Sequence, residues 1–315
     1  MLVLRSRYPR PTQIVFVDTN KTILQVQFVN CWFSSLRTDR CGVVFGIRYG
    51  VGECSRHVCG RQRSGTMRYV DRSIRSVGEM LQALKSQTKP KKLTWFRGHS
   101  RKDWRLVPSL ARDARHLGAE SALLKRFMQN AVPHLDIAPR EEWEWMFLMQ
   151  HHRAPTRLLD WSESALTALY FAVSDDKYKR AAGAVWCLDP IALNKEARID
   201  FKFSPEVPAF GTDNTTLSSY LPSRVEANPS TLNPVAIMGP RNTTRMAAQL
   251  GTFTVNHRLH TPIEKIGVRL HCWRWLIPAA AKPNIRAELA LLSYSALTLF
   301  PDLDRVADLS KELLP

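Results

Sequence analysis

The chain has 315 residues, of which 44% are hydrophobic and 23% are charged. A chain of this length and composition can bury a large core, which excludes the disordered and fibrous classes of protein. Lys and Arg outnumber Asp and Glu by 45 to 28, and the resulting net charge of +17 favours an anionic partner. Neither a membrane-length apolar run nor a signal-peptide core is evident, so we expect a cytoplasmic protein with no membrane partner.

Residues 1–66 differ in composition from the rest of the chain. They carry +7 of the net charge and four of the six cysteines. Those cysteines are Cys31, Cys41, Cys54 and Cys59. Zinc is an alternative here, but the paired short spacing of a zinc site is missing, so we expect no metal. Residues 1–66 show no amphipathic helical pattern, so we predict that they form a poorly ordered basic extension that results from a mis-assigned start. We expect residues 67–315 to fold alone.

The first half of the remaining chain alternates helical and strand patterns. Ser76 and Glu79 have the spacing of a capping box, which predicts a helix that ends before Pro90. Hydrophobic periodicity predicts further helices and two short strands in this half. We expect strands at 93–96 and 182–188 and helices at 119–131, from about 140, and at 163–174.

The second half begins with a long loop over residues 195–234, in which we expect one short helix near 217–221. Short strands and two terminal helices follow it. We expect strands at 235–238, 251–255 and 271–277 and helices at 283–293 and from 301 to 313. Helices around a late group of strands predict an α+β fold, a single large domain whose helices surround a small mixed or antiparallel sheet.

A polar segment interrupts two apolar helical patterns at residues 149–162. Its ligand-binding candidates are Gln150, His151, His152, Arg157 and Asp160, and its catalytic candidates are Thr156 and Ser162. Polar groups between buried elements must be satisfied or functional. Arg157 and Asp160 have a spacing that suits a charge-assisted pair, which would either fix the turn or bind a ligand. Adjacent histidines lack the i, i+4 spacing of a helical metal site, so we assign no metal to them.

Two further constellations lie outside that segment. The first contains Arg97, Gly98 and Ser100, where an arginine at the end of a strand precedes a glycine that would let a ligand approach the backbone. We assign these three residues to ligand binding, with a surface salt bridge as the alternative for Arg97. The second contains Gln249, which precedes a glycine and an alternating strand. Gln249 is either a ligand contact, in which case it is a catalytic candidate, or a capping residue.

Six sequence blocks in chain order resemble the FRG domain family, which is named for its Phe/Tyr-Arg-Gly motif. They are WFRG (95–98), WRLVPSLAR (104–112), MQHHRAPTRLLDW (149–161), ALYFAV (168–173), RMAAQLGTF (245–253) and TLFPDLDRV (298–306). His99 and Ser162 depart from the family, which often has Gln and Thr there. The resemblance implies a protein of bacterial or mobile-element type from a largely uncharacterised family, with a role as a toxin or in phage defence.

The order of these residues is similar to the layout of NAD-dependent ADP-ribosyltransferases, with NAD as the implied ligand. Arg97 would hold the dinucleotide, the segment 156–162 and its helix would lie beneath the nicotinamide ribose, and Gln249 would occupy the place of a late Glu. An uncharged Gln stabilises developing positive charge less well, so Glu264 or Glu288 are alternatives. The competing interpretations are a nucleic-acid-binding module and a non-catalytic interaction protein with a protein target.

Two expectations about these arginines can be tested against a structure. Arg97 and the polar residues of 150–162 should line one pocket, although more than fifty positions separate them. Arg157 should be buried and essential for folding. Arg97 should be partly open to a ligand, so that its loss costs the fold about 1 kcal/mol or less.

Overall fold

The computed structural model describes residues 67–89, 92–199, 206–211, 213, 217–227, 231–258 and 261–311. All of them belong to one compact unit, Arg61–Pro315. The predicted extension at 1–66 and its four cysteines lie outside the described residues, and so does most of the stretch 200–216 within the predicted loop. In the described ranges, no helix has the length and apolar character needed to span a membrane.

The described part of the unit contains a seven-stranded mixed sheet with the order β1-β7-β4-β2-β3-β6-β5. The strands are β1 (Arg72–Ser73), β2 (Trp95–His99), β3 (Leu158–Ser162), β4 (Gly183–Leu188), β5 (Val235–Ile237), β6 (Gly251–Val255) and β7 (Cys272–Ile277). Strand β1 pairs with β7 in parallel, and every other neighbouring pair is antiparallel. The predicted α+β class is therefore confirmed.

The longer helices predicted from the sequence are present, at 77–87, 120–131, 142–151, 165–173, 282–291 and 303–311, and shorter helices that were mostly not predicted accompany them. The helices are α1 (Val77–Gln87), α2 (Ala114–Leu117), α3 (Glu120–Ala131), α4 (Glu142–His151), α5 (Ala165–Val173), α6 (Pro190–Glu196), α9 (Pro222–Ala227), α10 (Thr244–Ala248), α11 (Lys282–Leu291), α12 (Ala296–Leu299) and α13 (Leu303–Lys311). Ser76 caps α1 by accepting the Glu79 N–H at 3.0 Å, as expected, while the Glu79 carboxylate accepts from the Arg75 N–H. The capping residue therefore fixes where the first helix starts.

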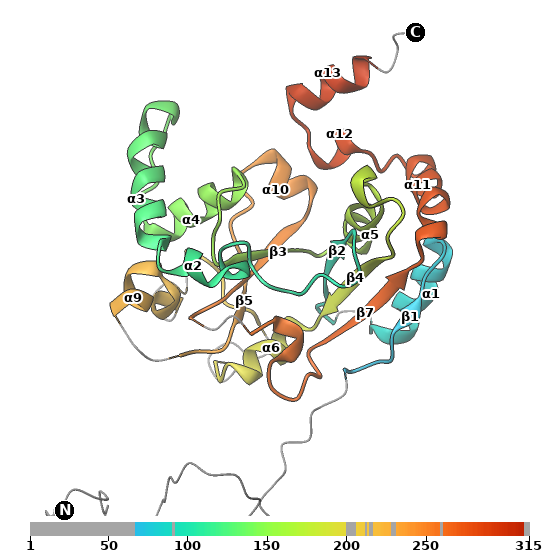
Figure 1. The fold of residues 1–315 in the computed structure, drawn as a ribbon, viewed down its shortest axis with the longest axis horizontal. Helices are drawn as coiled ribbons and strands as arrows, with labels where there is room; N and C mark the ends of the chain where they lie inside the picture. The colour runs from blue at the N-terminus through green and yellow to red at the C-terminus, as the bar shows by residue number, and fades with distance from the viewer. Residues whose placement is uncertain are drawn as a thin grey trace, which may run out of the picture. The chain divides into compact units, whose positions relative to one another are not determined.

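Helices cover both faces of the sheet. On one face, α1, α5 and α11 pack against strands β2, β4 and β7, and the helices α1 and α11 lie side by side beyond the β1 edge (Figure 1). Helix α4 packs against β3, β5 and β6 through Trp143, Met146 and Phe147. The opposite face is covered by α6 and by loop residues such as Leu106 and Ile263. Because both faces are covered, strand β4 is apolar and buried at every position.

Strand β3 contradicts the prediction of a polar turn between two helices. It lies at the centre of the sheet, with β2 on one side and β6 on the other. Asp160 and Ser162 interrupt the continuous apolar run expected of a strand that is covered on both faces, and this concealed the strand. The boundaries of β2 also differ from expectation, because Arg97 and Gly98 lie inside that strand rather than after it.

Gly98 is needed for the packing of α5 against β2. A Cβ atom at this position would lie 1.9 Å from the backbone oxygen of Ala168 and 2.7 Å from the backbone nitrogen of Ala172. Both contacts are to helix backbone, which cannot move aside. Gly98 therefore serves helix packing. It also lines the cavity described below, so its assignment to ligand binding stays a prediction.

Candidate functional site

The sheet opens between β2 and β3, and this opening creates the candidate site. Strand β2 forms five residue pairs with β4, and β3 forms five with β6. Between them, β2 and β3 share only the pair Phe96 and Ser162. Beyond that pair the two strands separate, and their edges face each other across a gap flanked by α4 and α5.

A cavity of about 460 Å³ occupies this opening, and we call it the arginine cavity. Its polar and aromatic lining includes Arg97, Ser100, Trp104, Arg112, Gln150, His151, Arg153, Asp160, Ser162, Phe171, Asp175, Arg245 and Gln249. These side chains come from β2, β3, α4, α5 and α10 and from the segments that follow β2, α4, α5 and α10. The predicted shared pocket of Arg97 and the 150–162 segment is therefore confirmed.

Arg97 crosses the gap between the two strands. Its Nε donates to His99 Nε2 at 3.0 Å, and its Nη1 donates to the backbone oxygen of Asp160 at 2.5 Å. The Asp160 carboxylate lies 3.8 Å from the same Nη1, and the Arg97 side chain is only 18% exposed. Arg97 is thus more buried and better bonded than the sequence predicted, and it joins β2 to β3 where the backbone ladder has ended.

His99 fixes the orientation of Arg97 from within β2. Its Nδ1 lies 3.3 Å from the backbone oxygen of Trp104, which makes Nδ1 the donor and leaves Nε2 free to accept from Arg97. Burial, followed by the charge of Arg97, lowers the pKa of His99 to about 3. A neutral imidazole therefore does here what a Gln side chain can also do, accepting at one atom and donating at another.

Asp160 is one of two carboxylates that line the cavity. Its Oδ2 accepts from Gln150 Nε2 at 2.7 Å, and its side chain is 55% exposed. Thr156 donates its hydroxyl to Gln150 Oε1 and accepts the Leu158 N–H. Thr156 is buried and does not line the cavity, so its visible role is to orient Gln150, which in turn orients Asp160.

Arg157 does not pair with Asp160. Successive residues of a strand point to opposite faces, so positions 157 and 160 lie on opposite sides of β3. Arg157 instead donates to both carboxylate oxygens of Glu120 and to the backbone oxygen of Asn256. The two side chains are 4% and 10% exposed, so this buried pair holds α3 to the sheet and lies outside the cavity.

The remaining predicted residues are divided between the cavity and its surroundings. Ser162 and Gln249 line it, and the Ser162 hydroxyl donates to the backbone oxygen of Gln249 at 2.6 Å. Gln249 Nε2 donates to Leu299 O at 2.9 Å, so the amide ties α10 to α12. Ser100 lines the cavity and donates its hydroxyl to Phe171 O. His152 lies in a different cavity, described below.

The alternative acids Glu264 and Glu288 do not line the arginine cavity. Glu264 is buried and accepts the Leu106 N–H at 3.2 Å, whereas Glu288 accepts the Val77 N–H at 2.6 Å. Both carboxylates join distant parts of the chain. Of the residues that line the cavity, only Asp160 and Asp175 are acidic.

Three arginines that line the cavity were not assigned to a site from the sequence: Arg112, Arg153 and Arg245. Arg245 donates to the backbone oxygen of His151 at 3.5 Å and stacks over the Phe300 ring. In the described part of the chain, the guanidinium groups of Arg112 and Arg153 have no hydrogen-bond partner. All three lie in sequence blocks that carry the family resemblance, and this was the signal available for finding them.

The cationic groups of the cavity are close enough to affect one another. Burial lowers the pKa of Arg97, and the nearby Arg112 lowers it further, while Asp160 opposes the shift. Burial and then Arg153 lower the pKa of Arg245. Arginines remain charged at neutral pH despite such shifts. Four guanidinium groups beside two carboxylates therefore give the cavity a positive potential, which suits an anionic ligand.

Comparison with known proteins agrees with the motif analysis. Residues 92–181 match the FRG domain family, which confirms the suspected resemblance in that part of the chain. The match includes the blocks that supply Arg97, Arg112, Arg153 and Asp160, whereas the block that contains Arg245 lies beyond it. Neither a curated protein nor a solved structure matches the chain.

Proposed function

We propose that the arginine cavity binds a phosphate-bearing nucleotide, with NAD as the ligand that best fits its lining. The observation that carries this proposal is the presence of four arginines in one cavity of about 460 Å³, a volume within the usual range for small-molecule sites. The planar guanidinium group matches phosphate oxygens with paired donors.

Arg112 and Arg153 are the best candidates for direct phosphate contacts. Both side chains line the cavity, and both residues are exposed. Arg153 also has a φ of 61°, a left-handed conformation that is uncommon for residues other than glycine and that frequently accompanies functional sites. Arg97 and Arg245 are already hydrogen-bonded to neighbouring groups, so they would contribute positive charge and their remaining N–H donors.

A nucleotide also needs an apolar surface for its base. Trp104 is 39% exposed at the cavity, with its ring edge-on to Tyr178 at a centroid distance of 5.0 Å. Phe96 and Phe171 line the interior. Aromatic rings held by their neighbours are suitable stacking partners for a base. Guanidinium groups beside aromatic rings thus support a nucleotide rather than inorganic phosphate.

For ADP-ribosyltransferase-like chemistry, Asp160 is a better candidate than Gln249. Cleavage of the nicotinamide–ribose bond develops positive charge on the ribose, which an oriented carboxylate stabilises. Asp160 carries that charge, faces the cavity and is held by Gln150 at 2.7 Å. Gln249 is neutral, and its Nε2 is already bonded to Leu299 O. In this proposal Gln249 and Ser162 shape the site, and Asp160 acts on the ligand.

A ligand panel tests this proposal against the alternatives. We expect NAD and ADP-ribose to raise the melting temperature of the full chain more than pyrophosphate does, since a ligand of the native state stabilises it in proportion to its affinity. A shift with single-stranded oligonucleotides alone would favour a nucleic-acid-binding module. A protein that responds to none of these compounds would favour a non-catalytic interaction protein.

Turnover requires a separate measurement. We expect the protein to release nicotinamide from NAD, with water or a nucleophile of a target protein forming the new bond to the ribose and giving up its proton. Asp160→Asn should abolish this release while NAD binding is retained, since the amide keeps the size but loses the charge. Gln249→Ala should release nicotinamide at a rate closer to wild type. Equal loss of activity in both variants would contradict the assignment of Asp160 as the acting group.

A further inference from the structure

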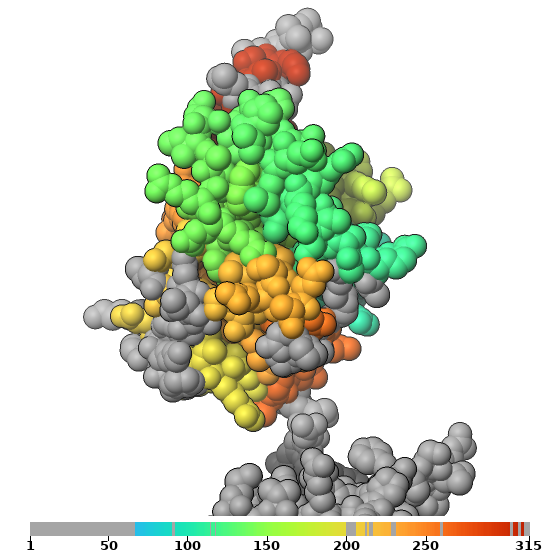
Figure 2. All heavy atoms as spheres, turned by 90° about the vertical axis from the view of Figure 1, so that its left-hand side faces the viewer, coloured from blue at the N-terminus to red at the C-terminus, as the bar shows by residue number. Residues whose placement is uncertain are grey.

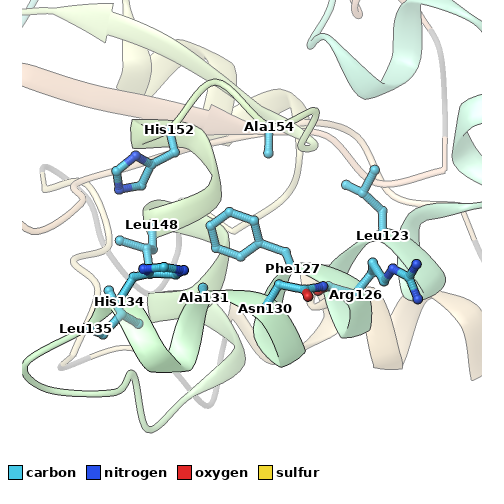
Figure 3. A pocket seen from close by; sticks show the side chains of 10 residues that line it. All are labelled: Leu123, Arg126, Phe127, Asn130, Ala131, His134, Leu135, Leu148, His152 and Ala154. Carbon is cyan, nitrogen blue, oxygen red and sulfur yellow. The ribbon is translucent and has the colours of Figure 1, made fainter.

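A second cavity, of about 620 Å³, lies between α3 and α4, and we call it the α3–α4 cavity. Helix α3 and its surroundings form part of the surface above α9 (Figure 2). Figure 3 shows Phe127 projecting from α3 into the cavity, with His152 and Ala154 on the opposite side. Arg126 lies toward one end and His134 toward the other.

The lining of this cavity is largely apolar and only half-buried. A small cluster of Leu124, Trp145 and Met149 underlies it. The partly buried side chains around that cluster include Leu123, Phe127, Ala131, Leu135 and Leu148. Such side chains remain accessible to solvent, so an apolar ligand that covers them would remove apolar surface from water.

The polar part of the lining is cationic or neutral. It consists of Arg126, Asn130, His134 and His152, and none of the described residues that line the cavity is acidic. Within the described part of the chain, the side chains of Arg126 and His134 have no hydrogen-bond partner. Arg126 therefore has donors available at the edge of an apolar cavity.

We infer that the α3–α4 cavity binds an amphiphilic anion, a carboxylate with an alkyl chain of medium length. The alkyl chain of the ligand would lie over Phe127 and Leu148, and its carboxylate would accept hydrogen bonds from Arg126. The cavity volume lies within the range of small-molecule sites. This ligand is distinct from the nucleotide proposed for the arginine cavity and does not depend on it.

The two cavities are separated by the turn after α4. His151 lines the arginine cavity and His152 lines the α3–α4 cavity, with their rings edge to face at a centroid distance of 4.9 Å. Ala154 lines both. The arginines of the other cavity also attract a carboxylate, so the experiment distinguishes the two sites.

Calorimetric titration of the full chain with octanoate, decanoate and dodecanoate, below their micellar concentrations, tests the inference. Affinity should rise about fourfold for each added methylene that becomes buried. Decanol, which lacks the charge, should bind about two- to fivefold more weakly than decanoate, as expected for an exposed ion pair. Equal affinities for octanoate and dodecanoate would overturn the inference.

Variants locate the site. Arg126→Ala should remove the difference between decanoate and decanol, whereas Lys125→Ala, a matched change at a neighbouring residue outside the lining, should preserve it. Ala131→Phe should fill the cavity and weaken decanoate binding at least about tenfold in a protein that still melts cooperatively. If decanoate binding depends on Arg112 rather than Arg126, the carboxylate binds in the arginine cavity and the inference is wrong.

Discussion

Arg97 contributes to structure as well as to the candidate site. Its side chain joins β2 to β3 through His99 and the Asp160 backbone oxygen. Removal of the guanidinium would leave the buried His99 Nε2 and the Asp160 backbone oxygen without this donor, and one buried acceptor left unpaired costs about 1 to 3 kcal/mol. The sequence predicted a smaller cost, because a single chain reveals neither the gap between the strands nor the atom that Arg97 reaches across it.

Arg157→Ala should destabilise the protein more than Arg97→Ala. The change leaves Glu120 buried without its partner, and breaking a buried pair costs about 3 to 5 kcal/mol. Chemical denaturation of both variants gives the two free energies of unfolding. The double replacement Arg157→Met with Glu120→Leu should recover much of the loss, since neither charge then remains buried. If Arg157→Ala were as stable as wild type, the pair of Arg157 and Glu120 would not be what holds α3 to the sheet.

The neutral state of His99 predicts a specific acid sensitivity. Its pKa is about 3 in the folded protein and about 6.5 in an unfolded chain, so the unfolded state binds more protons between these values. Stability from this residue is therefore complete above pH 6.5 and falls as the pH is lowered, by up to about 1.4 kcal/mol per pH unit. His99→Gln keeps one acceptor and one donor but does not titrate.

The free energy of unfolding of wild type and His99→Gln should be compared between pH 7 and pH 4.5. The wild-type value should fall more steeply below pH 6.5, while contributions from the other titrating groups are common to both proteins. Parallel curves would show that His99 titrates normally in the folded protein, which contradicts its role as a neutral acceptor for Arg97.

The close packing of α5 on β2 depends on Gly98. We expect Gly98→Ala to prevent cooperative folding, because the new methyl group would overlap the backbone of Ala168. Gly78→Ala in α1 is the matched control, since the nearest atom to a Cβ there is 3.7 Å away and alanine favours helix by up to about 1 kcal/mol. Melting curves of both proteins give the comparison. A stable Gly98→Ala protein would show that α5 can move away from β2.

Helices were predicted from sequence more successfully than the strand that carries the site. Helices α3, α4 and α5 each have a local signal: α3 has an amphipathic pattern, α4 a capping box formed by Glu141 and Glu144, and α5 a cap in Ser164, which accepts the Thr167 N–H. Strand β3 has the sequence LLDWS, in which Asp160 and Ser162 face the cavity where apolar residues would be expected. Polar residues required by a site thus conceal the strand that carries them, as expected where function overrides local pattern.

The candidate site was only partly predictable because its residues come from distant segments. Sequence blocks indicated Arg97, Gln150, His151 and Asp160. The partner of Arg157 could not be found, because Glu120 lies 37 positions away on a surface-like helix. Local spacing suggested Asp160 instead, and strand alternation excludes that pair.

Residues 67–315 should fold without the segment that precedes them. In the part of the chain that the structure describes, residues from Met67 onward form the hydrophobic clusters given above. A chain that starts at Met67 should therefore melt cooperatively, at a temperature close to that of the full chain. Circular dichroism and calorimetry of both proteins make the comparison, and loss of cooperativity in the shorter chain alone would place the domain boundary earlier.

Calorimetric titration of ADP-ribose tests the arginine cavity most directly. The wild-type protein should bind ADP-ribose at one site. Arg112→Ala should weaken this binding about tenfold or more, since one charge-assisted contact contributes about 1.5 to 3 kcal/mol. Arg115→Ala is the matched control, because Arg115 is exposed, lies in the same segment and pairs with Asp113. It should bind like wild type. Absence of binding to wild type, or equal affinities for all three proteins, would contradict the proposal that this cavity is a nucleotide site.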